Sequence, residues 1–216
     1  MERPSRVVSS VWGCVLLALP IAAPAAAQDC RGEVEAAFVK QRAGKSYRFT
    51  AVSPSPQGET RMTIDYQMPD RMYQKVEAPG HPAPVETIAI AKWAWGTMGG
   101  GWEELQPQFA QSITSHVHST LVAPPPVTAS FACLGKVVVD GTELLGYRTL
   151  VPGGPGPAGG PPISRTIYID PASGLPVRNT VAEEGSGAAP IFDARYSYPA
   201  DIAIEAPIGG PATRAR

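Results

Sequence analysis

The side chains that most often carry out covalent or metal chemistry are few in this chain, and they gather in one short segment. The segment contains Ser112, Ser115, His116 and His118. A serine beside a histidine can form a nucleophile–base pair, and two histidines can bind one metal ion. His116 and His118 are two positions apart, however, so on a helix they point to different faces and cannot share a metal. We therefore expect surface polar residues here, with no catalytic group and no metal site.

Other sequence patterns that support catalysis are absent as well. The adjacent pairs Glu103-Glu104 and Glu183-Glu184 do not form an acid/base couple, because neighbouring side chains on a strand face opposite ways. The sequence contains no Gly-x-Ser-x-Gly elbow, no Walker loop and no His-Glu-x-x-His motif. We expect a protein that is not an enzyme and needs no cofactor. An enzyme with an unrecognised site is the least favoured alternative.

The large apolar side chains give a stronger signal than the polar ones. Trp93 and Trp95 share one face if their segment is a strand, because side chains alternate along a strand. Methionine fills irregular space and repacks around varied apolar partners. Our candidates for the wall of an apolar ligand-binding cavity are Trp93, Trp95, Met62, Met72, Tyr66 and Ile64. The alternative for each of them is ordinary core packing between a sheet and helices.

The N-terminal residues are typical of an export signal. Arg3 and Arg6 give a basic start, an apolar run follows, and Ala25-Ala26-Ala27 forms a small-residue exit. The apolar run is interrupted by prolines and is short for a bilayer span, so an uncleaved anchor is the less favoured alternative. We predict a signal peptide over residues 1–27, cleavage after Ala27 and a mature protein in the periplasm.

Two of the three cysteines, Cys30 and Cys133, remain after this cleavage. In an exported protein an even number of cysteines most often pairs. Two distant thiols supply too few ligands for a metal site. We therefore predict a Cys30–Cys133 disulfide, with two buried free thiols as the alternative.

Length and charge restrict the domain count and the partners. The chain has 216 residues, with 18 Lys and Arg against 19 Asp and Glu. It has no basic stripe for nucleic acid and no polybasic cluster for an anionic membrane surface. The length after cleavage suits one domain with a real core. We place this domain at residues 28–207 and expect a disordered tail over residues 208–216.

Residue periodicity predicts an α+β fold. Apolar residues at helical spacing predict helices over Glu33–Arg42 and Phe109–Leu121. Alternating segments and turns such as Asp140-Gly141 predict consecutive hairpins of a curved antiparallel sheet, with the helices on one face. The Gly- and Pro-rich stretch 152–162 is expected to be a hairpin loop. The ten expected strands are Tyr47–Ala51, Arg61–Gln67, Arg71–Glu77, Val85–Lys92, Trp93–Thr97, Phe131–Val139, Thr142–Val151, Ser164–Asp170, Leu175–Glu183 and Ile191–Tyr198.

The order of several short motifs resembles a known family. Pro69-Asp70-Arg71-Met72 opens a strand, Gly100-Gly101-Trp102-Glu103 follows a pair of tryptophans, and Asp170-Pro171-Ala172-Ser173-Gly174-Leu175-Pro176 forms a hairpin. This series resembles the LolA-like superfamily of periplasmic lipoprotein carriers, which includes the LolB, RseB and mycobacterial LppX/LprG branches. The resemblance implies an unclosed β-barrel with helices on its concave face. It also implies an apolar cavity that holds acyl chains or another lipophilic ligand. Arg71 and Arg178 match general family positions, where we expect structural roles.

These observations favour a soluble periplasmic carrier or binder of lipids or lipoprotein acyl chains. An RseB-like envelope sensor that acts through protein contacts is the alternative. The expected partners are a lipophilic ligand or lipoprotein acyl chains and an envelope membrane protein, with no nucleic acid. We expect the protein to be a monomer.

Overall fold

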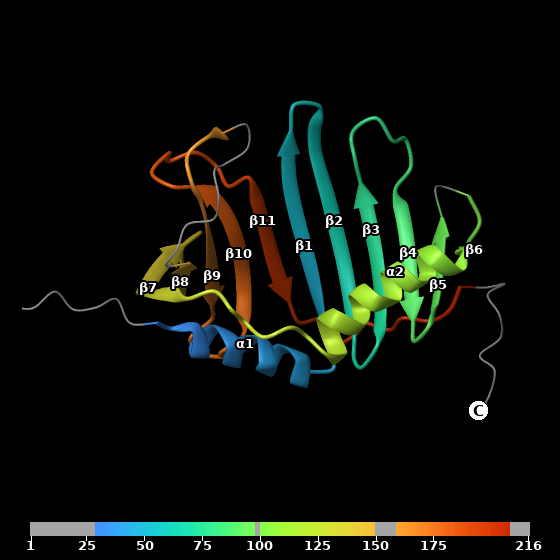
Figure 1. Ribbon diagram of the computed structural model, residues 1–216, viewed down its shortest axis with the longest axis horizontal. Helices are drawn as coiled ribbons and strands as arrows, with labels where there is room; N and C mark the ends of the chain where they lie inside the picture. Colours follow the sequence, from blue (N-terminus) through green and yellow to red (C-terminus); the bar gives the residue numbers. More distant parts are fainter. Residues whose placement is uncertain (1–28, 98–99, 150–158, 208–216) are drawn as a thin grey trace, which may run out of the picture.

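The computed structural model describes residues 29–97, 100–149 and 159–207. Within these residues the chain forms one antiparallel sheet of eleven strands, two α-helices and a short π-helical turn, η1 (Figure 1). The elements in chain order are α1 (Arg31–Ala43), β1 (Ser46–Ser55), β2 (Gly58–Gln67), β3 (Arg71–Glu77), β4 (Val85–Ile90), β5 (Trp93–Thr97), β6 (Glu103–Glu104), α2 (Pro107–Val117), η1 (His118–Val122), β7 (Phe131–Val139), β8 (Thr142–Thr149), β9 (Ile163–Ile169), β10 (Pro176–Glu183) and β11 (Phe192–Ser197). The predicted signal peptide, the predicted tail and most of the Gly- and Pro-rich stretch lie outside the described residues.

The sheet is built from hairpins, and one long-range pairing joins its two halves. Its strand order is β6-β5-β4-β3-β2-β1-β11-β10-β9-β8-β7, so most neighbours in the sheet are also neighbours in the chain. The exception is the pairing of β1 with β11, which places Phe49 beside Tyr196. Strands β6 and β7 form the opposite edges and do not pair with each other, so the sheet is an unclosed barrel. The expected fold class is confirmed.

The predicted elements occur where the periodicity placed them, with one addition. Both predicted helices are present, and the second continues into η1. The additional strand, β6, consists of two residues that pair with β5 beyond the Gly-rich turn. A strand of two glutamates has no apolar alternation, and this is the reason that the sequence pattern did not reveal it.

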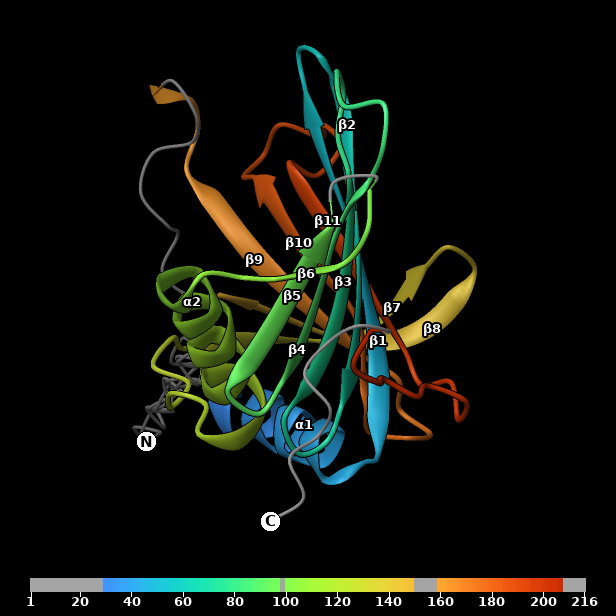
Figure 2. The ribbon, with the colours of Figure 1, turned by 90° about the vertical axis from the view of Figure 1, so that its right-hand side faces the viewer.

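Both helices cover the concave side of the sheet (Figure 2). Helix α1 packs on β7–β9, where Val34 and Ala37 are buried against Tyr147 and Ile167. Helix α2 and η1 pack on the other half, where Val117 and Leu121 meet the strands from β1 to β5. Burial of the apolar side chains in these two clusters stabilises the packing of the helices on the sheet by about 25 cal/mol per Å² of apolar surface removed from water.

The convex side carries a smaller apolar cluster and several ion pairs. Ile204, in the chain after β11, is buried there against Ile88 and Trp95. Arg71 fastens this segment, because its Nη1 donates a hydrogen bond to the carbonyl oxygen of Ile204 at 2.6 Å. Arg178 makes a bidentate ion pair with Asp193, at 2.8 and 2.7 Å. Arg71 and Arg178 therefore both make structural contacts, as we expect from the sequence. Within the described part of the chain, no helix combines the length and the apolar character that crossing a bilayer requires.

Candidate functional site

A cavity of about 710 Å³ lies between the concave face of the sheet and the two helices. Its floor comes from β1, β2, β3, β9 and β11, and its walls come from α1, α2 and η1. The lining residues are Phe38, Gln41, Arg42, Tyr47, Phe49, Met62, Ile64, Tyr66, Met72, Gln74, Ser112, Ile113, His116, Thr120, Arg165 and Tyr196. The volume falls within the range of about 300–1,000 Å³ that is usual for small-molecule sites.

Strand alternation places the floor residues. Met62, Ile64 and Tyr66 are at every second position of β2, so all three face the helices. Tyr66 pairs directly with Met72 across the β2–β3 ladder, which adds the next strand to the same floor. Directly opposite residues of an antiparallel pair lie on the same face of the sheet. The floor therefore continues from strand to strand.

Aromatic rings form the centre of the floor. The ring centroids of Tyr47 and Tyr66 are 4.9 Å apart, and those of Phe49 and Tyr196 are 5.5 Å apart. Phe38 of α1 approaches Tyr196 edge-on at 6.1 Å. These separations are within the favourable range for aromatic pairs, so the rings hold each other in place as well as lining the cavity.

The hydroxyl groups around the cavity are neutral at ordinary pH. Burial raises the pKa of Tyr66 to about 12 and raises the pKa of Tyr47 further above its usual value. The Tyr66 hydroxyl oxygen, on β2, lies 3.4 Å from Nε2 of His116, which belongs to α2. Gln41, in the last turn of α1, is buried. Its Nε2 donates a hydrogen bond to the hydroxyl oxygen of Tyr198 at 3.1 Å. The site thus offers apolar surface with a few polar groups in fixed positions.

Four of the six candidate cavity residues lie together. Met62, Ile64, Tyr66 and Met72 all line the cavity, and Met72 is only 1% exposed. The structure separates Trp93 and Trp95 from these four. Neither tryptophan is among the lining residues, so the expectation that they form part of this wall is corrected.

The register of the sheet explains the position of the tryptophans. Trp95 pairs with Ile88, and Ile88 pairs with Tyr73, whose neighbour Met72 faces the cavity. Trp95 is therefore on the convex face, where it is 3% exposed and packs with Ile204. Trp93 shares that face and is 36% exposed. The alternation within β5 was predicted correctly, but the choice of face depends on how β5 pairs with β4.

Several lining residues were absent from the sequence-based candidates. Tyr47 and Phe49 alternate along β1, which is the signal that could have identified them. Tyr196 lies on β11, at the far end of the chain, and reaches the site only through the β1–β11 pairing. Arg42 and Arg165 come from α1 and β9, and no local pattern connects these two residues.

The serine–histidine segment forms part of α2 and η1. Ser112 and His116 are one helical turn apart, and both line the cavity. Within the described residues, Nε2 of His116 lies close to the Tyr66 hydroxyl and not to a serine. His118 begins η1 and is exposed. His116 is exposed as well, but it lines the cavity, whereas His118 does not.

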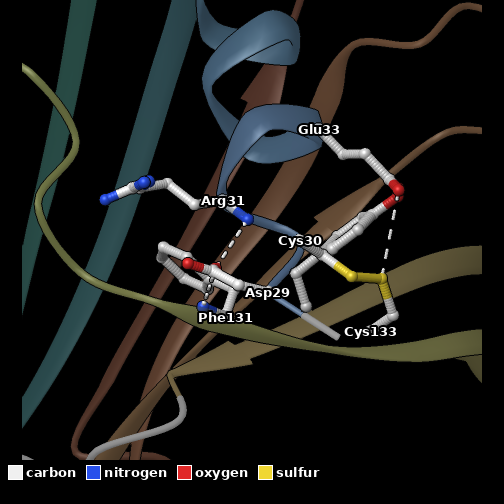
Figure 3. Close-up of a disulfide and its surroundings, with 7 residues drawn as sticks. Asp29, Cys30, Arg31, Glu33, Phe131 and Cys133 are labelled. Carbon is white, nitrogen blue, oxygen red and sulfur yellow. Dashed lines mark hydrogen bonds between the residues drawn. A yellow bond between two sulfur atoms is a disulfide. The ribbon is translucent and has the colours of Figure 1, made fainter. Parts of the chain in front are cut away.

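The predicted disulfide is confirmed. Cys30 and Cys133 are joined with their Cα atoms 5.7 Å apart, and the bond connects the start of α1 to β7 (Figure 3). Glu33 lies beside it, with Oε1 4.0 Å from the sulfur of Cys133 and Oε2 accepting a hydrogen bond from Tyr147 at 2.6 Å. Asp29 accepts hydrogen bonds from the backbone amides of Arg31 and Phe131, at 3.0 and 3.1 Å. These contacts fix the N-terminal end of α1 on the sheet.

Solved structures resemble this architecture, whereas the sequence comparisons found no match. No family model matches the sequence, and no curated protein matches it. The structure of LprF from Mycobacterium bovis superposes with a TM-score of 0.51 at 15% identity, over 82% of this chain and 96% of that chain. The chain has the same fold as LprF.

Other solved structures are similar at lower scores. MucB of Pseudomonas aeruginosa, in its complex with MucA, superposes with a TM-score of 0.43 at 12% identity, over 79% of this chain and 58% of that chain. The LolA superfamily protein NE2245 from Nitrosomonas europaea superposes with a TM-score of 0.31 at 9% identity, over 80% of this chain and 93% of that chain.

Proposed function

We propose that this protein is an exported, monomeric carrier or binder that holds the acyl chains of a lipid or lipoprotein in the cavity beneath α1 and α2. The observation that carries the proposal is the cavity of about 710 Å³ lined largely by aromatic and aliphatic side chains. Met62, Ile64, Tyr66 and Met72 are the proposed contacts for the chain. In the described part of the chain, the residues around this space are held by the sheet and by two helices that pack against it.

The energetics suit a binding protein. Moving an acyl chain from water into an apolar site is favourable by about 0.8 kcal/mol for each buried CH₂ group. Several buried methylenes therefore outweigh the cost of immobilising one ligand without any covalent step. Methionine at two positions of the floor allows the wall to adapt to chains of different length or branching.

The proposed location is the periplasm. The basic, apolar and small-residue parts of residues 1–27 support export, and the Cys30–Cys133 disulfide suits an oxidising compartment. The LolA-like fold supports the same assignment by analogy. An envelope membrane protein is the proposed donor or acceptor of the ligand.

The experiment is native mass spectrometry of protein purified from its own envelope, followed by lipid extraction. The proposal predicts a population whose mass exceeds that of the polypeptide by the mass of one acyl lipid. It also predicts that added acyl ligands raise the melting temperature, because a ligand that binds only the folded state stabilises it. If the folded protein carries no lipid and no member of an acyl-ligand panel raises its melting temperature, a role in protein contacts replaces the carrier.

A further inference from the structure

The formal charges around the cavity all have the same sign. Arg42 of α1 and Arg165 of β9 are among the described lining residues, and those lining residues include no Asp and no Glu. The cavity is otherwise apolar or neutral. The two positive charges therefore have no opposite charge among the lining residues.

The two arginines also differ from most other arginines of the fold. Arg48, Arg178 and Arg195 each make an ion pair with an aspartate on the convex side. Among the described residues, no hydrogen bond or ion pair involves the guanidinium of Arg42 or of Arg165. Their donors are therefore available to a ligand.

Neighbouring hydroxyl groups do not supply the missing negative charge. Burial raises the pKa of Tyr196 and of Tyr47 above the ordinary tyrosine value, so both stay neutral at physiological pH. The site thus keeps a net positive charge while its floor remains apolar.

Exposure gives the cavity a direction. Met72, Ile64 and Tyr66 are buried on the floor, whereas Arg42 is half-buried and Arg165 is exposed. An amphiphile would place its chain on the buried methionine and tyrosine surface and its headgroup toward the less buried, positively charged parts of the wall. Arginine suits such a headgroup, because its planar group donates two parallel hydrogen bonds to a carboxylate or a phosphate.

We propose that the ligand is an acyl amphiphile with an anionic headgroup, and that the positive charges of Arg42 and Arg165 at the cavity wall favour its carboxylate or phosphate. This inference rests on the proposed function and adds the class of headgroup to it. The arginines select among acyl ligands, while the apolar floor supplies the affinity that all of them share.

The test compares ligands that share a chain and differ in charge. Dodecanoate is measured against dodecanol, and a lysophosphatidylglycerol against the monoacylglycerol with the same chain, at neutral pH and low salt. We expect the wild type to bind each anion about tenfold more tightly than its neutral partner, the effect of one charge-assisted hydrogen bond. Preference in the first pair identifies carboxylate recognition, and preference in the second identifies phosphate recognition.

Variants locate the source of the preference. Arg42→Gln and Arg165→Gln should each reduce it, and the double variant should abolish it, with dodecanol binding unchanged. Arg148→Gln is the matched control, because Arg148 is exposed, follows the inward-facing Tyr147 on β8 and does not line the cavity. A second test uses the wild type alone. High salt should reduce its preference for the anion over the neutral partner, because salt screens the attraction between the arginines and the headgroup.

The outcomes separate this inference from the proposed function. Equal affinity for the anion and its neutral partner, with both bound, would overturn the headgroup assignment and leave the acyl-chain proposal standing. A preference that survives in a folded double variant would also overturn it. Absence of binding by all four ligands would overturn both proposals.

Discussion

Asp140 Oδ2 lies 2.7 Å from Nη2 of Arg195, although Asp140 belongs to the β7–β8 turn and two strands, β9 and β10, lie between β8 and the β11 strand of Arg195. The same carboxylate is 3.4 Å from Nη1 of Arg178 on β10. Asp140 and Gly141 both adopt positive φ angles, of 50° and 80°, as a tight two-residue turn requires. The tip of the β7–β8 hairpin is therefore attached to the middle of the sheet on its convex side.

The Asp140→Asn variant should loosen this hairpin tip without changing the turn, because asparagine tolerates positive φ. The hydrogen bond from Arg195 and then the charge of Arg178 lower the pKa of Asp140. A carboxylate with a lowered pKa stabilises the fold above its unfolded pKa and loses this effect as the pH falls through the folded value. The difference in melting temperature between wild type and variant should be present at neutral pH and disappear below about pH 4.

Amide hydrogen exchange measures the same change locally. Exchange in β7 and β8 should accelerate in Asp140→Asn and stay at the wild-type rate in Glu143→Gln. Glu143 belongs to the same hairpin, and among the described residues its ion-pair partner is Lys136 of the neighbouring strand, at 2.8 Å. Equal exchange in the wild type and in Asp140→Asn would show that the Arg195 contact does not hold the hairpin.

Removal of the disulfide should destabilise the protein and release the start of α1. The bond closes a loop with a sequence separation of 103 residues, and a loop of that length contributes up to about 4–5 kcal/mol in the chain-entropy model. Urea unfolding of the Cys30→Ser/Cys133→Ser double variant should show this loss, and the wild type under reducing conditions should behave like the variant. Peptide mapping without reductant should recover the two cysteines as one linked pair. Two freely alkylated thiols in the native exported protein would contradict the bond.

Alkaline titration should destabilise the fold steeply. Burial is the first cause of a raised pKa for Tyr47, Tyr66, Tyr73, Tyr147, Tyr196 and Tyr198. The pKa values of Tyr66 and Tyr73 rise to about 12. A raised pKa means that stability is intact below the unfolded value near pH 10 and is lost as the pH rises toward the folded value.

Ultraviolet absorbance of phenolate and circular dichroism measure this titration together. Most phenolate should form only when the sheet unfolds, above about pH 11. If all the tyrosines titrated near pH 10 while the circular dichroism remained native, their burial as described here would be wrong.

Ligand binding should leave the tryptophan emission almost unchanged. The three described tryptophans, Trp93, Trp95 and Trp102, belong to or border the convex side, and none of them lines the cavity. Saturating dodecanoate should therefore raise the melting temperature without shifting the emission maximum. A large shift would place the ligand on the convex face, beside Trp93 and Trp95.

Local patterns were sufficient to predict both α-helices, ten of the eleven described strands and one part of the site. Alternation identified Met62, Ile64 and Tyr66 as members of one face, and the structure places all three on the cavity floor. Helical spacing identified α1 and α2, and the export context identified the Cys30–Cys133 pair. Strand alternation and helical spacing are set by residues close together in the chain, and the disulfide prediction depends on the oxidising compartment that the export signal implies.

Other features depend on pairings between distant parts of the chain. Alternation shows that Trp93 and Trp95 share a face, but only the β4–β5 register decides that this face is convex. Tyr196 reaches the cavity through the pairing of the last strand with the first. Arg42 and Arg165 line the same cavity only because α1 packs on the sheet, and no short sequence pattern specifies this packing.

The most direct test of the acyl-chain cavity is to fill it from α2. Ile113 lines the cavity, so Ile113→Trp should occupy part of its volume at a modest cost in stability. Phe109 lies one turn earlier on the same helix, is 58% exposed and does not line the cavity, so Phe109→Trp is the matched control. Circular dichroism of both variants first verifies that the sheet is intact.

The measurement is the affinity for dodecanoate, together with the amount of acyl lipid that copurifies with each variant. The account predicts that Ile113→Trp weakens binding at least about tenfold and removes the copurifying lipid, while Phe109→Trp matches the wild type. A folded Ile113→Trp protein that binds dodecanoate and retains lipid as the wild type does would contradict the account.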